Sequence, residues 1–182
     1  MAKIYLVRHG KAAAGFAGHA DPGLDDLGRA QADATAAMLA DLGPLPIYSS
    51  PLARARETAE PLAARWSQEV IIEPRVAEIP SPTDDLTERA AWLRQAMAGT
   101  WSELDETLND WRRALIDCVT AIPEDSVVFC HFIAINVAVG GANDDERMVL
   151  FAPDNGSVTT LSNDGGRLSV LELGRTADTH VN

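Results

Sequence analysis

The fold is decided by the stretch Lys3-Ile4-Tyr5-Leu6-Val7-Arg8-His9-Gly10, close to the amino terminus. The four consecutive apolar residues 4–7 predict a strand that is buried on both faces, as in a parallel sheet. The run then ends at a cation, an imidazole and a glycine, a residue that tolerates unusual backbone angles. In open α/β sheets, ligands bind at the carboxyl edge of the strands. We therefore expect Arg8 and His9 to lie at a binding site.

Composition narrows the class of protein. A chain of 182 residues suits one domain with a proper core. We expect a single domain over residues 1–182, with its core at about 3–173 and a frayed tail at 174–182. The formal net charge is −12, from 15 Lys and Arg against 27 Asp and Glu. This balance argues against nucleic-acid binding, and any phosphate site must be a local basic pocket.

Cysteine usage and the amino terminus bear on location. Cys118 and Cys130 both lie in apolar runs, which indicates buried thiols rather than a disulfide framework. The first apolar run is too short for a secretory signal, and no segment approaches membrane-spanning length. We expect a cytoplasmic protein with no membrane partner. The sequence leaves the oligomeric state open, with a homodimer as one candidate.

Alternating strands and helices predict an α/β protein. We expect one domain of three layers, a mostly parallel sheet with helices on both faces and an antiparallel hairpin at the end. The expected strands are 4–7, 47–50, 70–72, 127–130, 158–161 and 168–171, and the expected helices are 25–42, 52–66, 84–97, 104–122 and 132–139.

Local sequence signals bear on the second and the fourth of these expected helices. Ser50 suits an N-cap and Pro51 the first helical position of the second helix, while Pro61 could kink or break it. Ser102 with Asp105 resembles a capping box before the fourth helix.

Two buried strands each end in a histidine, His9 and His131. If these strands are parallel neighbours, both imidazoles emerge at one edge of the sheet. The helix after Pro51 starts beyond another strand's carboxyl end and brings Arg54 to that edge. Together with Arg8, these residues would form a strongly positive pocket, which suits a phosphoryl group.

These residues also resemble a family. Arg8-His9-Gly10 resembles the signature of the histidine phosphatase superfamily, also called phosphoglycerate mutase-like. The stretch 49–59, which contains Arg54, is similar to its second motif. Glu78 and His131 stand where that family has its acidic residue and second histidine, and 155–158 resembles a turn and strand near its carboxyl end. The likeness runs from residue 3 to about 162 and implies a phosphoglycerate mutase-like fold.

The resemblance implies a two-step mechanism. His9 would attack phosphorus to give a phosphohistidine, which water then hydrolyses. Arg8 and Arg54 would hold the phosphoryl oxygens, with His131, if protonated, as a third contact. Glu78 would protonate the leaving oxygen and later deprotonate the water. No metal or other cofactor is expected, because the arginines supply the electrostatic stabilisation.

Four further residues are expected to contact the substrate, namely Gly10, Lys11, Phe132 and Ser157. The expected partner is a small phosphorylated substrate or a phosphoprotein.

Three features depart from the family pattern. Residues 12–14 are all alanine where a small polar residue and an asparagine are common, Phe132 replaces a usual glycine, and the segment 78–101 is shorter than in the true mutases. These features favour a metal-independent phosphomonoester phosphatase. The alternatives are a phosphoglycerate mutase, a protein phosphohistidine phosphatase and a non-catalytic phosphate-binding module, the last suggested by Phe132.

Overall fold

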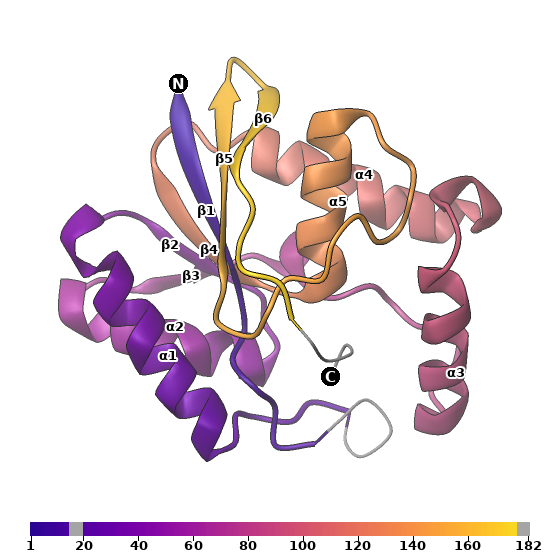
Figure 1. Cartoon of the computed structure of the whole chain (residues 1–182), viewed down its shortest axis with the longest axis horizontal. Helices are drawn as coiled ribbons and strands as arrows, with labels where there is room; N and C mark the ends of the chain where they lie inside the picture. The colour runs from indigo at the N-terminus through magenta and orange to yellow at the C-terminus, as the bar shows by residue number, and fades with distance from the viewer. Residues whose placement is uncertain (15–19, 178–182) are drawn as a thin grey trace.

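A six-stranded sheet with the strand order β3-β2-β4-β1-β5-β6 forms the centre of the computed structural model, which describes residues 1–14 and 20–177 (Figure 1). The strands are β1 (Ala2–Arg8), β2 (Ile47–Ser49), β3 (Val70–Ile72), β4 (Ser126–Cys130), β5 (Val158–Asp164) and β6 (Arg167–Glu172). The helices are α1 (Asp26–Leu39), η1 (Ala40–Leu42), α2 (Ala53–Trp66), η2 (Pro74–Val76), α3 (Leu86–Met97), η3 (Trp101–Glu103), α4 (Glu106–Thr120) and α5 (Phe132–Asn143).

Strand pairing confirms the predicted α/β fold. β1 pairs in parallel with β4, β4 with β2, and β2 with β3, whereas β5 and β6 form the predicted antiparallel hairpin beside β1. Arg8 lies in register with Cys130, so the residues that follow, His9 and His131, leave neighbouring strands at the same edge. None of the helices in the described ranges is long and apolar enough to cross a membrane.

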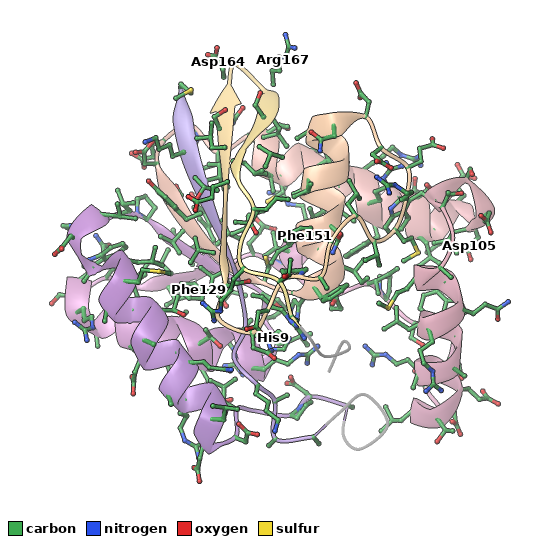
Figure 2. All side chains as sticks on the ribbon, viewed as in Figure 1. His9, Asp105, Phe129, Phe151, Asp164 and Arg167 are labelled. Atoms are coloured by element: carbon green, nitrogen blue, oxygen red, sulfur yellow. The ribbon has the colours of Figure 1, made fainter. Side chains whose placement is uncertain are left out.

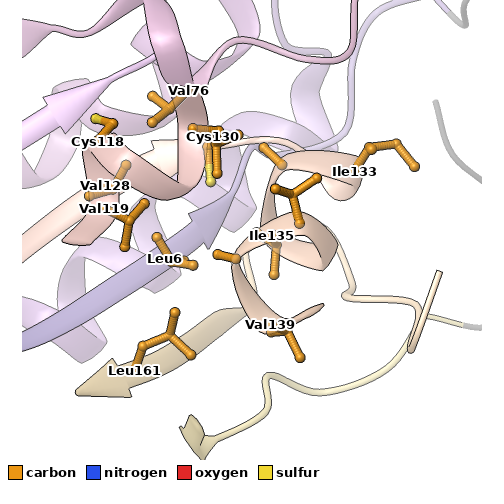
Figure 3. Packing of buried hydrophobic residues seen from close by; sticks show 14 of the residues in the cluster. Leu6, Val76, Cys118, Val119, Val128, Cys130, Ile133, Ile135, Val139 and Leu161 are labelled. Atoms are coloured by element: carbon orange, nitrogen blue, oxygen red, sulfur yellow. The ribbon is translucent and has the colours of Figure 1, made fainter. Parts of the chain in front are cut away.

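Helices cover both faces of the sheet. On one face, Val7 and Ile47 pack with Leu62 of α2 in a core shared with α1. On the other face, Leu6 and Val128 pack in a larger core with α4 and α5 (Figure 3). Every residue of α5 from 132 to 140 is buried, as expected for an apolar helix enclosed by the fold. The site at the strand ends is therefore held by a rigid three-layer body.

The second helix begins later than its cap signal predicts. α2 starts at Ala53 with Leu52 as its N-cap, so the prediction of Ser50 as N-cap was wrong. The Ser50 hydroxyl instead accepts a hydrogen bond from the Leu52 amide and lies 2.8 Å from Nε2 of His131. Pro61 does not break α2, because burial of the helix against the sheet outweighs the local preference.

The fourth helix is also capped differently from the prediction. The capping box joins Thr100 and Glu103 around η3, not Ser102 and Asp105. Asp105 is itself the N-cap of α4 and accepts a hydrogen bond from the Leu108 amide. The short helix η3 and the longer α4 follow one another with separate caps, which the spacing of polar residues alone does not resolve.

The carboxyl-terminal segment is more ordered than predicted up to residue 177. Thr176 forms a β-bridge with Pro153, and the Ala177 amide donates to the Ala152 carbonyl at 2.7 Å. The prediction of fraying from residue 174 was therefore wrong for 174–177. Residues 178–182 lie outside the described part of the chain.

The loop after β1 packs tightly on the start of α1. A Cβ atom on Gly10 would lie 2.5 Å from the Gly28 carbonyl oxygen, and one on Gly28 would overlap the Lys11 carbonyl oxygen. Two glycines thus allow the backbone after His9 to approach the helix closely.

This contact predicts the effect of Gly28→Ala. The added methyl group meets backbone rather than a flexible side chain, so we expect the free energy of unfolding to fall by about 3 kcal/mol. Urea denaturation measures the change. Gly141→Ala in α5 is the matched control, because its methyl group meets only the movable Ile116 side chain and should cost less than about 1 kcal/mol. Equal effects of the two substitutions would contradict the packing argument.

Candidate active site

His9 is a buried imidazole whose partners define its tautomer. Its Nδ1 lies 2.6 Å from the Gly10 carbonyl oxygen, and a carbonyl can only accept, so Nδ1 carries the proton. Nε2 accepts a hydrogen bond from Nε of Arg54 at 3.3 Å. The ring is 2% exposed. His9 therefore presents the lone pair of Nε2 beside the arginine.

Burial also favours the neutral form of His9. Desolvation, followed by the nearby charges of Arg54 and Arg8, holds the pKa of His9 well below its usual value. A neutral imidazole is the nucleophilic form, so His9 is ready to react at neutral pH.

The backbone around His9 is fixed by two side chains whose role the sequence analysis missed. The Gly10 amide donates to the Thr58 hydroxyl at 2.9 Å, and this hydroxyl donates to the Arg54 carbonyl. The amide of Asn155 donates to the His9 carbonyl at 3.0 Å. Both residues lie inside stretches that resemble the family motifs, and that position is the only sequence signal for them.

Arg8 is fully buried, yet part of its guanidinium group has no protein partner. Nη1 donates to the Pro153 carbonyl at 2.8 Å, whereas Nε and Nη2 have no hydrogen-bond partner among the described residues. The guanidinium lies 5.2 Å from the Phe132 ring centroid, a cation–π contact. Burial lowers the pKa of Arg8 to about 10, and the charges of Glu78 and Asp154 oppose this shift. Arg8 is therefore charged at neutral pH.

His131 stands beside His9, with the two ring centroids 5.1 Å apart. Its Nε2 lies 2.8 Å from the Ser50 hydroxyl, which already accepts from the Leu52 amide. Among the hydrogen bonds of the described residues the Ser50 hydroxyl has no other acceptor, so we assign its proton to Nε2 and the ring proton of His131 to Nδ1. Burial and the charge of Arg54 lower the pKa of His131, so the ring is neutral without a ligand. It can still donate one hydrogen bond through Nδ1.

Unpartnered polar atoms gather around these residues. In the described ranges, the buried side-chain atoms without a partner are Nε and Nη2 of Arg8, Nδ1 of His131, Oγ of Ser157 and Nε of Arg112. Three of these atoms belong to Arg8 and His131, at the strand ends beside His9. Each buried polar group left without a partner costs about 1–3 kcal/mol, and an anion would satisfy these donors together.

Glu78 is buried rather than exposed to solvent. It is 7% exposed and accepts hydrogen bonds from the amides of Ile133 and Ala134, at the start of α5, each at 3.2 Å. Burial raises the pKa of Glu78, while these amides and the charge of Arg54 oppose the rise. The charge of Glu78 also acts on Arg8 and Arg54, so the carboxyl group faces the basic cluster.

The remaining predicted substrate contacts differ in placement. Gly10 and Ser157 lie beside His9 and Arg8, and the Phe132 ring packs against the Arg8 guanidinium. The Lys11 ammonium lies 3.5 Å from Asp25, and its side chain is half exposed, so the structure directs it to α1 rather than to the buried donors. Residues 1–14 and 20–177 contain no group of three or more potential metal ligands.

Comparisons with known proteins agree with this geometry. The sequence profile of the family described as "Histidine phosphatase superfamily (branch 1)" matches residues 4–176. A protein of Erwinia tasmaniensis described as a probable phosphoglycerate mutase GpmB is 30% identical, with 82% of this chain and 81% of the relative covered. One of the same description from Escherichia fergusonii is 35% identical, with 76% and 74% covered.

Solved structures share the fold. Phosphoserine phosphatase from Entamoeba histolytica, in complex with 3-phosphoglyceric acid, superimposes with a TM-score of 0.77 and 23% identity, covering 97% of this chain and 98% of the other. A mycobacterial glucosyl-3-phosphoglycerate phosphatase in complex with VO3 gives 0.74 and 23%, covering 97% and 100%. With the family match over residues 4–176, the chain belongs to the histidine phosphatase superfamily.

Proposed function

We propose that this protein is a metal-independent phosphatase that hydrolyses a phosphomonoester through a phosphohistidine at His9. The observation that carries the proposal is a neutral, buried His9 whose Nε2 lone pair borders a cluster of buried donors without partners. Such a cluster is costly unless an anion occupies it.

The first step joins phosphorus to Nε2 of His9. A phosphoryl oxygen replaces Nε2 as the partner of Arg54, which frees the lone pair for in-line attack. The bond from phosphorus to the leaving oxygen breaks, and Glu78 supplies the proton that this oxygen takes up. The imidazole becomes positively charged, and its Nδ1 keeps its proton and its hydrogen bond to the Gly10 carbonyl oxygen. Arg8, with its two unpartnered nitrogens, stabilises the charge on the equatorial oxygens.

The second step returns His9 to its starting state. Water attacks phosphorus, Glu78 accepts a proton from it, and the electron pair of the phosphorus–nitrogen bond returns to Nε2. Burial of Glu78 supports both roles, because a raised pKa keeps a carboxyl group protonated nearer to neutral pH. The Nδ1 proton of His131 and the Ser157 hydroxyl complete the donor set for phosphate.

A phosphoglycerate mutase is the second candidate, favoured by relatives of 30% and 35% identity described as probable phosphoglycerate mutases. Both functions pass through the phosphoenzyme, and they differ in what accepts the phosphoryl group from His9. The acceptor is water in the phosphatase and a phosphoglycerate hydroxyl in the mutase. Exchange between 2- and 3-phosphoglycerate that is faster than release of inorganic phosphate would select the mutase.

Hydrolysis of phenyl phosphate tests the proposed chemistry. We expect turnover that a chelator does not reduce, and a loss of about 10⁴-fold or more in His9→Ala, because the covalent route disappears. Arg54→Ala should lower kcat/KM by about 100-fold or more through loss of charge stabilisation. Arg56→Ala, on the exposed side of the same helix, is the matched control and should retain activity.

Two results would reject the phosphatase. Turnover that the chelator abolishes would show a different mechanism. Binding of phosphate without any hydrolysis would select the non-catalytic module.

The role of Glu78 predicts a dependence on the leaving group. A 4-nitrophenolate leaves without protonation, whereas phenolate needs a proton in the transition state. Glu78→Gln should therefore lower kcat/KM, which reports only the steps up to the phosphoenzyme, by about 100-fold for phenyl phosphate and by less than about tenfold for 4-nitrophenyl phosphate. Thermal denaturation of the variant checks that the contacts with α5 survive. An equal loss of kcat/KM on both substrates, with the fold intact, would reject Glu78 as the acid that protonates the leaving oxygen.

A further inference from the structure

The guanidinium group of Arg8 is held so that one of its edges stays open. Its Nη1 donates to the Pro153 carbonyl, and the Phe132 ring covers one face, with the ring centroid 5.2 Å from Cζ. The two nitrogens without a partner in the described ranges, Nε and Nη2, share the remaining edge. This edge is the fork through which an arginine binds two oxygens of one anion. The direction of the fork therefore depends on where Pro153 and Phe132 lie.

These two contacts come from different parts of the chain. Phe132 is the first residue of α5, whereas Pro153 lies on the loop 144–157 between α5 and β5. Figure 2 shows this loop returning along α5 toward His9, with Phe151 labelled on it. Both contacts hold at once only if the spacing between α5 and the loop is fixed.

Asn136 joins α5 to this loop, and its side chain is buried. Its Nδ2 donates to the carbonyls of Phe132 and Phe151 at 3.0 and 3.1 Å. Its Oδ1 accepts from the amides of Leu150 and Phe151 at 2.8 and 3.2 Å. Both protons and both acceptor positions of the side-chain amide are thus used. Asn136 therefore fixes the first turn of α5 against the segment that leads to the Pro153 carbonyl.

The other side of the loop has a separate support. The Ala177 amide donates to the Ala152 carbonyl at 2.7 Å. The Asp154 amide donates to the Arg175 carbonyl at 3.0 Å. Without Asn136 the loop would keep these two bonds but lose its connection to α5. We therefore expect the fold to survive such a change, while the guanidinium between the loop and α5 loses its fixed direction.

We propose that Asn136 is a positioning residue of the phosphoryl site, which holds α5 and the loop at the spacing that directs the Arg8 fork toward the phosphoryl oxygens. This inference rests on the contact between Arg8 and phosphate in the proposed function. Its physical basis is preorganisation, because a fork that is already fixed in the free protein needs no ordering when the anion binds.

A double-mutant cycle with inorganic phosphate as the probe tests this role without turnover. Asn136→Thr keeps a side chain of similar size whose hydroxyl can still bond the Phe132 carbonyl, but it loses the bonds to the loop. Calorimetry should show phosphate binding about tenfold weaker in Asn136→Thr than in the wild type. In the Arg8→Lys background the same change should cost less than about threefold, because lysine has no fork to direct. Asn136→Ser, without the added methyl group, is the second variant.

Asn163→Thr is the matched control. Asn163 is also a buried asparagine whose Nδ2 donates to two carbonyls, those of Thr120 and Ile122. Its Oδ1 accepts from the Gly166 amide, and it pairs with the first residue of β1, at the far end of this strand from Arg8. We expect Asn163→Thr to unfold at a lower urea concentration than the wild type and to bind phosphate with unchanged affinity.

Nitrogen-15 relaxation at Nε of Arg8 tests the wild-type protein directly and needs no variant. A fork fixed by its surroundings should have an order parameter of about 0.85 without ligand, as a rigid backbone does. A value below about 0.6 would overturn the inference. Equal weakening of phosphate binding by Asn136→Thr in both backgrounds, no weakening, or the same loss in Asn163→Thr would also overturn it.

The two proposals fail separately in this design. Arg8→Lys alone should weaken phosphate binding by about tenfold or more, and an unchanged affinity would reject the Arg8 contact together with this inference. A loss in Arg8→Lys without a loss in Asn136→Thr would reject the inference alone. Coupling between Asn136 and Arg8 in a protein that does not hydrolyse phenyl phosphate would reject the phosphatase and keep the inference.

Discussion

The hydrogen bond from Nδ1 of His9 to the Gly10 carbonyl oxygen is the interaction on which the site depends. It places the ring proton on Nδ1 and leaves Nε2 as the only nucleophilic nitrogen. The carbonyl can hold this position because the Gly10 backbone is fixed by the Thr58 hydroxyl and by close packing on Gly28. The fold therefore controls the chemistry through the backbone just after β1.

Burial and positive charge act together on this imidazole. Desolvation is the largest cause that lowers the pKa of His9, and the two neighbouring arginines lower this pKa further. The same arginines remain charged and give the pocket the opposite sign to the protein, whose formal net charge is −12. A phosphorylated ligand is thus attracted only at short range, where the buried donors are. This arrangement favours selectivity at the pocket over long-range capture.

The fold was predictable from sequence wherever a pattern had one structural solution. The apolar run of β1 and the hairpin that turns at Gly165-Gly166 between β5 and β6 each fitted one element. The start of α2 was not predictable, because Ser50 had two possible partners and its contact with His131 comes from a distant strand. The order at 174–177 likewise depends on long-range bonds to the loop at 152–154.

The candidate site was likewise predictable from the sequence only in part. Histidines at the ends of two buried strands predicted the meeting of His9 and His131, since parallel neighbours share an edge. The burial of Glu78 could not be predicted, because it follows from how the start of α5 packs on this residue. Lys11 looked like a phosphate contact by its position after Gly10, yet Asp25 on the neighbouring segment competes for its charge.

Nitrogen-15 NMR of the imidazole rings across a pH titration is the most direct measurement of the central claim. We predict that His9 carries its proton on Nδ1, that Nε2 stays unprotonated at neutral pH, and that the ring becomes charged only well below pH 6.5, the usual pKa of histidine. Because the native ring resists a proton that the unfolded chain accepts, His9 should also lower stability as the pH falls below that value. A proton on Nε2 at neutral pH, or a His9 pKa at or above 6.5, would contradict the account.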